Sequence, residues 1–127
     1  MIDKVGAIII EEKKMLIVRE KNLDVFFIPG GKRKGNESNE AALRREIMEE
    51  LGVEIKSMEF YKNFTAQAST ENDKVTVISY FCETNDEPEP SGEIEEILWI
   101  DRNNYKKINL GNVLKIMIPE LIKNGFL

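Results

Sequence analysis

The chain has 127 residues, a formal net charge of −5 and no histidine, with 42% hydrophobic and 32% charged residues. This length predicts a single domain, residues 1–127, with a real hydrophobic core, and the negative charge argues against a nucleic-acid polymer as partner. The lack of histidine excludes serine–histidine and cysteine–histidine catalysis, and also histidine-ligated zinc.

The sequence shows no sign of a membrane or secreted protein. No apolar run approaches the length of a membrane span, and residues 1–4 lead directly into a strand-like run, so we expect no secretory signal. Cys82 is the only cysteine, which rules out an internal disulfide and fits a reducing compartment. We therefore expect a cytoplasmic protein without a membrane partner, in which Cys82 packs as a small buried hydrophobe.

Two apolar runs near the N-terminus, residues 5–10 and 15–18, predict buried strands joined by a charged turn. Arg19 follows the second run and is either a surface charge or a bidentate partner of a phosphate group. Residues 25–28 predict a third short strand, which leads into Pro29-Gly30-Gly31. We expect this Pro-Gly-Gly sequence not to continue a regular element, because proline fixes its own φ and glycine admits φ values that other residues avoid.

A short acidic helix is predicted after this loop. Ser38 is a suitable N-cap, because its hydroxyl can accept a hydrogen bond from an amide of the first turn. Gly52 is a suitable C-terminal stop. Leu43, Ile47 and Leu51 recur at i, i+4 and i+8 and form one apolar stripe, which we expect to face the core.

Three glutamates, Glu46, Glu49 and Glu50, share a neighbouring face of this helix because they are related by i+3 and i+4. Like charges at these spacings destabilise a helix slightly, so either water solvates them or a cation neutralises them. A ligand set made only of oxygen favours a hard ion, Mg²⁺ or Mn²⁺, over zinc. The alternative is an ordinary solvated acidic face.

The second half of the chain predicts a β-hairpin. Residues 58–68 and 75–84 are β-prone, and the turn signal at residues 71–73 separates them. A further short strand is predicted at residues 97–100, in which Trp99 packs in the core rather than stacking on a base.

The C-terminal residues 113–121 have the apolar spacing of a helix. Pro119 must kink or restart this helix, because proline lacks the amide that an interior position needs. Together with the strands, this pattern alone supports only a mixed α and β fold.

Residues 31–53 match the Nudix hydrolase signature at every defined position: Gly, five residues, Glu, seven residues, Arg-Glu, an aliphatic residue, any residue, Glu-Glu, any residue, Gly and an aliphatic residue. At average residue usage, such agreement arises by chance roughly once in 10⁸ windows. Lys32 and the glycines before it resemble the MutT-type branch. The resemblance implies an α/β/α sandwich around a mixed β-sheet, and an enzyme that hydrolyses a nucleoside diphosphate linked to another group.

The resemblance also implies roles for the residues of the acidic helix. Glu49 and Glu50 would be metal ligands, and Glu46 a ligand or a base. Arg45 would steer a glutamate of the motif through an ion pair. The Gly30 carbonyl is a further candidate ligand, because glycine lets the backbone approach closely.

Other residues of the loop are given binding or structural roles. Glu37 resembles the family position that bonds back within the loop–helix unit, and Gly52 is structural. Gly31 and Lys32 belong to the segment that binds phosphate, with Arg19 as a further phosphate partner. A carboxylate outside the motif often completes the site in this family. The candidates are Glu93, Glu95 and Glu96, of which we favour Glu93.

The motif defines which bond is cut but not the group attached to the nucleoside diphosphate. Marker residues of ADP-ribose and dinucleoside polyphosphate enzymes, expected near Ala68 and Ser69, are missing. The default substrate is then a (deoxy)nucleoside triphosphate, oxidised forms included, which Mg²⁺- or Mn²⁺-dependent hydrolysis converts to the monophosphate and pyrophosphate.

Alternatives to this function stay open. One is a Nudix hydrolase of another substrate, such as ADP-ribose or a dinucleoside polyphosphate, and another is a non-catalytic nucleotide-binding regulator. A homodimer is also open. The candidates for base recognition are Asn63, Phe64, Tyr80 and Asn112, and none of them is assigned.

Overall fold

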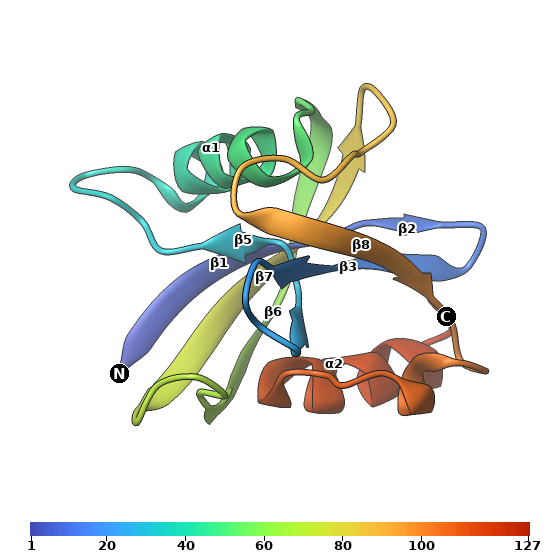
Figure 1. The fold of residues 1–127 in the computed structure, drawn as a ribbon. Helices are drawn as coiled ribbons and strands as arrows, with labels where there is room; N and C mark the ends of the chain where they lie inside the picture. The colour runs from blue at the N-terminus through green and yellow to red at the C-terminus, as the bar shows by residue number, and fades with distance from the viewer.

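The computed structural model describes residues 1–127 and arranges them as layers of strands between two helices (Figure 1). α1 (Asn39–Leu51) covers one side of the strands and α2 (Asn112–Lys123) covers the other. The predicted α/β/α arrangement around a mixed sheet is confirmed, and the strands divide between two sheets.

The first sheet has the strand order β5-β1-β7-β6 and contains both parallel and antiparallel pairs. β1 (Ile2–Ile8) runs parallel to β7 (Lys74–Thr84), and β7 pairs antiparallel with β6 (Ile55–Gln67). The predicted hairpin is therefore confirmed. The first strand begins at Ile2 and ends at Ile8, so the predicted strand of residues 5–10 is wrong at both ends. Ile10 belongs to a separate strand, β2 (Ile10–Glu11), in the second sheet.

The two-residue strand β5 (Gly30–Gly31) pairs antiparallel with β1, so the expectation that Pro-Gly-Gly leaves regular structure is wrong. Gly30 has a φ of 146°, and a Cβ at this position would collide with the carbonyl oxygen of Val5. Glycine is what allows the chain to approach β1 closely enough to form the ladder.

The second sheet is built on β3 (Lys14–Glu20), which pairs antiparallel with each of its neighbours. These neighbours are β2 (Ile10–Glu11), β4 (Phe26–Phe27) and β8 (Ile94–Ile100). β8 starts earlier than the predicted residues 97–100. Trp99 packs, partly buried, against the core on the α1 side, as predicted.

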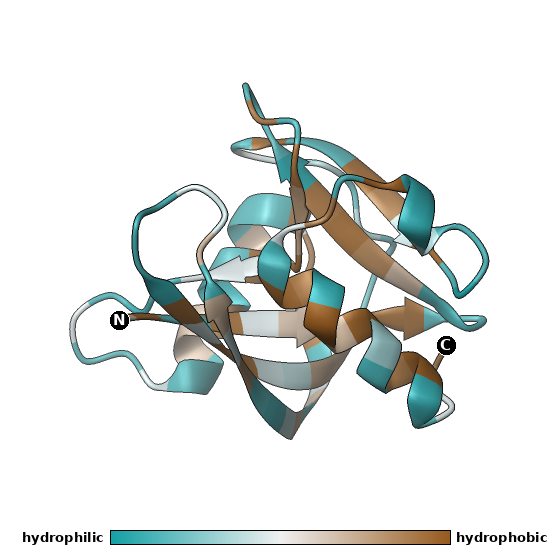
Figure 2. Ribbon diagram, turned by 90° about the horizontal axis from the view of Figure 1, so that it is seen from below, coloured by the Kyte–Doolittle hydropathy of each residue, from teal (hydrophilic) through white to brown (hydrophobic).

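The helices and sheets enclose two hydrophobic clusters, one on the α1 side and one on the α2 side. The longest hydrophobic stretches lie in strands, and most loops are hydrophilic or intermediate (Figure 2). Cys82 is buried in the α1-side cluster, and burial raises the pKa of its thiol to about 12, which confirms its prediction as a buried hydrophobe. Neither helix is long and apolar enough to cross a membrane.

Both predicted caps of α1 are present. Ser38 Oγ accepts a hydrogen bond from the Ala41 amide at 3.1 Å, and Gly52 ends the helix with a left-handed φ of 65°. Leu43, Ile47 and Leu51 are all buried, so the predicted apolar stripe faces the core. This packing fixes the rotation of α1 and therefore the direction of its acidic face.

The helix α2 is continuous through Pro119, so of the two predicted outcomes, a kink or a restart, the restart does not occur. Pro119 has no amide hydrogen to donate to the Lys115 carbonyl four residues earlier. Lys115 and Pro119 are both exposed, so water can bond to this carbonyl instead. The opposite face of α2 is buried and keeps the helix in place. Its buried residues are Val113, Leu114, Met117, Ile118 and Leu121.

Candidate active site

Arg45 on α1 connects the glycine-rich loop to the acidic face of the helix. Its Nε and Nη2 atoms donate to the two carboxylate oxygens of Glu37, at 2.8 and 2.9 Å. Its Nη1 atom donates to Glu46 Oε1 at 2.9 Å, and Nη2 also donates to the Lys32 carbonyl oxygen at 3.1 Å. Because a bidentate arginine–carboxylate pair is geometrically specific, the guanidinium fixes the Glu46 carboxylate relative to the loop.

Glu37 is held by hydrogen bonds from both sides. Besides the bonds from Arg45, Glu37 Oε1 accepts the Lys34 amide at 2.7 Å. These hydrogen bonds lower the pKa of Glu37 to about 2, and the bond to Glu37 in turn raises the pKa of Arg45. Glu37 therefore stays ionised at neutral pH and ties the loop to the helix.

Glu46 and Glu50 lie together where α1 meets β5. Glu50 Oε1 accepts the Gly30 amide at 3.1 Å. Burial raises the pKa of Glu50 to about 9, with the charge of Glu46 adding to the effect and the Gly30 hydrogen bond opposing it. The Glu46 side chain is only 14% exposed. A Cβ at residue 31 would lie 2.5 Å from its carboxyl carbon, so only glycine fits there.

This pair of carboxylates suits a divalent cation. Two adjacent acidic groups, one of them desolvated, resist ionising together, and a bound cation would remove that resistance. Oxygen ligands of this kind are those that Mg²⁺ and Mn²⁺ prefer.

Glu49 does not join the pair in this structure. Its side chain is 51% exposed, and its carboxylate oxygens lie 3.5 Å from Arg45 Nη1. No set of three acidic, histidine or cysteine side chains gathers at one point. Two of the three predicted glutamate ligands are thus brought together, and Gly30 lies beside them.

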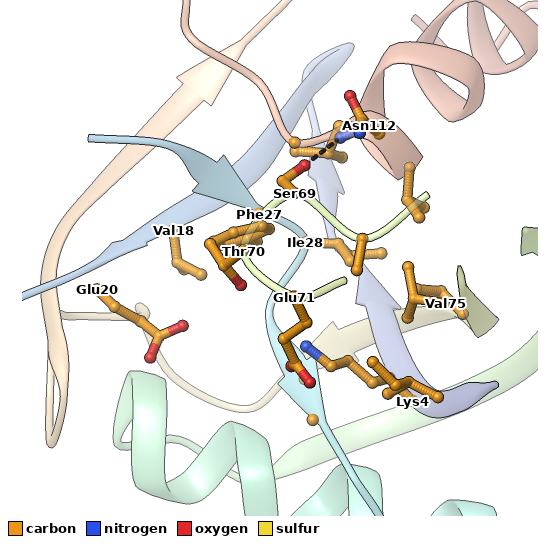
Figure 3. Close-up of a pocket in the computed structure, with 18 of the residues that line it drawn as sticks. Lys4, Val18, Glu20, Phe27, Ile28, Ser69, Thr70, Glu71, Val75 and Asn112 are labelled. Atoms are coloured by element: carbon orange, nitrogen blue, oxygen red, sulfur yellow. Dashed lines mark hydrogen bonds between the residues drawn. The ribbon is translucent and has the colours of Figure 1, made fainter. Parts of the chain in front are cut away.

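A cavity that Glu50 helps to line is bounded by residues of both sheets. It extends to Asn112 at the N-terminus of α2 (Figure 3). It holds about 810 Å³ of space free of protein atoms, part of it open to solvent. Gly30 and Gly31 line the cavity beside Glu50, and Asn112 lines it on the α2 side. Apolar side chains lie between them, among them Val18, Phe27, Ile28, Val75, Val113 and Leu114.

Glu20 is a further candidate for the site, which the sequence analysis did not identify. It lines the same cavity, and its charge contributes to the raised pKa of Glu50. In the sequence it follows Arg19 in a run of surface-type charges. Alternation along β3 is the signal that could have found it, because Val18 and Glu20 share one face of the strand and Val18 also lines the cavity.

The two predicted phosphate-binding cations lie outside this lining. Arg19 Nε donates to Glu96 at 3.2 Å and Nη1 donates to the Leu23 carbonyl at 2.9 Å, so its guanidinium is occupied. Lys32 is half-exposed, and its ammonium lies 3.9 Å from the carboxylate of Glu71. Glu71 does line the cavity, which places Lys32 at its edge.

The candidate acids outside the motif surround the start of β8. The loop before them is bonded to the end of α1, since the Ser91 amide donates to the Glu50 carbonyl at 2.9 Å. Glu93 is exposed, and its carbonyl accepts the Lys21 amide at 2.9 Å. Neither Glu93 nor Glu95 nor Glu96 lines the cavity.

Only one of the four candidates for base recognition lines the cavity. Asn112 does so from the first residue of α2. Phe64 belongs to the hydrophobic core on the α2 side, and Tyr80 packs edge-on against Phe60, with ring centroids 5.7 Å apart. Asn63 pairs with Ile78 in the β6–β7 ladder and is exposed.

Comparisons with known proteins agree with this architecture. The family model described as NUDIX domain matches residues 2–121. A curated relative, "8-oxo-dGTP diphosphatase" of Buchnera aphidicola subsp. Schizaphis graminum, is 37% identical over 60 residues, which cover 44% of this chain and 46% of the relative. The chain thus matches about half the length of that relative.

Solved structures of similar fold cover nearly the whole chain. A nudix hydrolase family member from Chromobacterium violaceum has a TM-score of 0.76 at 25% identity, covering 97% of this chain and 77% of that one. The MutT mutator protein from Bacillus halodurans has a TM-score of 0.75 at 17% identity, and the match covers 94% of this chain and 80% of that one. The second likeness concerns the fold alone.

Proposed function

The chain belongs to the NUDIX family, and on this premise we propose that it is a divalent-metal-dependent pyrophosphohydrolase of (deoxy)nucleoside triphosphates, oxidised forms included. The products would be the monophosphate and pyrophosphate. The observation that carries this proposal is the Glu46–Glu50 carboxylate pair at the edge of a cavity with apolar walls. The similarity to an 8-oxo-dGTP diphosphatase supports a nucleoside triphosphate as the substrate class.

Glu46 and Glu50 would hold the cation, and Glu49 would join them by turning away from Arg45. When bound, Mg²⁺ or Mn²⁺ supplies charge neutralisation for the phosphate oxygens and acidifies a water molecule. If Glu46 serves as a base instead of a ligand, its fixed hydrogen bond to Arg45 still determines where it can accept a proton.

The remaining residues of the site would position the substrate. Arg45 keeps the Glu46 carboxylate and the glycine-rich loop in one geometry, which limits the motion that a reacting group would otherwise have. Lys32 at the edge of the cavity would bind a phosphate in place of its weak pairing with Glu71. The apolar part of the cavity would take the nucleobase, because a planar ring gains most from burial against such side chains.

A panel of nucleotides tests the proposal. Phosphorus NMR in ¹⁸O-labelled water with Mg²⁺ reports both the substrate cleaved and the phosphorus attacked. We expect a nucleoside triphosphate to be converted to the monophosphate with pyrophosphate as co-product. Preferential cleavage of ADP-ribose or of a dinucleoside polyphosphate would contradict the substrate class, and no cleavage of any nucleotide would contradict the enzymatic function.

A pair of variants tests the role of the carboxylates. Glu50→Gln should reduce turnover by more than the roughly 10- to 100-fold that loss of a group supporting a metal ligand costs. Glu59→Gln is the matched control, because Glu59 is an exposed acid on β6 away from the cavity. Equal turnover in the two variants would remove Glu50 from the site.

A further inference from the structure

The N-terminus of α2 is capped by a residue from a distant turn. The residue that precedes the helix is Gly111, which has no side chain to accept a hydrogen bond. Instead, Ser69 Oγ accepts the Asn112 amide at 2.9 Å (Figure 3). Asn112 Nδ2 in turn donates to the Gln67 carbonyl at 2.8 Å. We call these two hydrogen bonds the turn–helix clasp.

The clasp joins two parts of the cavity wall. Gln67, Ala68, Ser69, Thr70 and Glu71 are consecutive lining residues from the end of β6 and the β6–β7 turn, and Asn112 lines the cavity from α2. The two segments lie far apart in the chain, so no local backbone geometry holds them at a fixed separation.

Besides the packing of Ala68 against the α2-side core, two ion pairs hold this turn, and both are weak. Lys32 and Glu71 are 3.9 Å apart, and the N-terminal ammonium lies 3.2 Å from the carboxylate of Asp73, with each of these side chains close to half-exposed. Exposed ion pairs of this kind contribute little. A helix cap is worth more, because it satisfies an amide that has no partner within the helix. The Ser69 hydroxyl is therefore one of the two hydrogen-bonding groups, with the Asn112 carboxamide, that tie this side of the cavity to α2.

The clasp also orients the Asn112 side chain. Because a carbonyl oxygen accepts only from the nitrogen of a carboxamide, the bond to Gln67 determines which way the amide is turned. The carboxamide oxygen of Asn112 has no partner within the chain.

We propose that Ser69 is a positioning residue for substrate selection, which holds the β6–β7 turn against α2 so that the cavity keeps the shape that selects among nucleobases. This inference rests on the proposed nucleotide function. It assigns Ser69 no contact with the reacting phosphates, since Glu46 and Glu50 lie where α1 meets β5 rather than at α2.

Kinetics of Ser69→Ala test the inference. We expect KM for the best nucleoside triphosphate to rise about fivefold, the ratio that one neutral hydrogen bond or cap typically supports. The preference for that base over the next one should fall by a similar factor, while kcat stays within about twofold because the carboxylates are untouched. A residue with a merely structural role would lower thermal stability without this division between KM and kcat.

Two further variants control the result. Ser69→Thr keeps a hydroxyl at the capping position and should restore both KM and base preference. Ser57→Ala removes a serine hydroxyl that bonds Glu83 on the β6–β7 ladder outside the cavity, and should change neither quantity. Unchanged KM and base preference in Ser69→Ala, or failure of threonine to restore them, would overturn the inference.

Binding measurements separate this inference from the proposed function. Calorimetry with Ca²⁺ and a series of nucleoside triphosphates gives dissociation constants without turnover. Base-selective binding that weakens in Ser69→Ala supports the inference even if the wild-type chain cleaves none of these nucleotides, a result that would overturn only the proposed function. Failure of the wild-type chain to bind any nucleotide would overturn both.

Discussion

At the scale of single residues, the site depends on side chains whose chemistry follows from their neighbours. Arg45 and Glu37 form a bidentate pair, and that pair fixes Glu46. The carboxyl group of Glu50 lies next to that of Glu46, and the charge of Glu46 contributes to the raised pKa of Glu50. The sequence motif could predict these residues because their spacing along one helix decides which of them meet. The motif could not predict Glu20, because the approach of the Glu20 side chain to Glu50 depends on how β3 lies relative to α1.

The close contact between Gly31 and Glu46 predicts the effect of a substitution on turnover. Gly31→Ala should displace the Glu46 carboxylate, whose carbon would lie 2.5 Å from the new Cβ. A displacement of about 1 Å in a reacting site costs about 10²-fold in rate, so we expect a loss of turnover of this size with the fold intact by circular dichroism. Gly125→Ala, at a left-handed φ of 83° far from the acidic pair and with no atom within 4 Å of the new Cβ, should lower stability slightly but keep full turnover. Normal turnover in Gly31→Ala would show that the contact is unimportant.

Cys82 gives the second residue-scale prediction. Cys82 is 5% exposed, and burial raises the pKa of its thiol to about 12, so very little of it is the reactive thiolate at pH 8. A disulfide reagent should therefore leave the native protein unmodified for hours and react fully in guanidinium chloride. Rapid reaction of the native protein would show that the strand β7 opens or that the thiol is accessible.

At the scale of elements, α1 and the β6–β7 hairpin could be predicted from local signals. Ser38 and Gly52 are capping residues by their own chemistry. The strand β5 could not be predicted, because its ladder with β1 exists only through a close approach that Gly30 permits. β8 begins before the predicted residues 97–100, because pairing with β3 outweighs the low strand propensity of Glu95 and Glu96.

The junction between the loop and α1 gives a prediction on pH. The folded protein lowers the pKa of Glu37 from 4.5 to about 2, so the ionised form favours the folded state. This contribution is complete above pH 4.5 and is lost as the pH falls toward 2. Glu37→Gln should therefore lower stability at neutral pH and reduce the loss of stability between about pH 4.5 and 2. Denaturation curves of both proteins across this range provide the measurement, and parallel pH profiles would contradict the assigned role.

At the scale of the whole molecule, the cavity is assembled from both sheets, the β6–β7 turn and the start of α2. The sequence predicts a helix from residue 113 and a turn at residues 71–73, but only the folded chain brings Asn112 and Ser69, which lie just outside these ranges, together. The fold class could be predicted because the layers follow from the order of helices and strands together with the Nudix resemblance. The walls of the cavity could not be predicted, because they depend on contacts between distant segments, and the periodicity of apolar residues along one element does not predict such contacts.

The central claim is that the Glu46–Glu50 pair binds a divalent cation. Thermal unfolding with and without millimolar Mg²⁺ or Mn²⁺ tests it most directly, because a ligand that binds only the folded state raises its stability. We predict that the melting temperature of the wild-type protein rises by several degrees, and that Glu50→Gln loses most of this gain whereas Glu59→Gln retains it. No gain in the wild-type protein, or an equal gain in Glu50→Gln, would contradict the account.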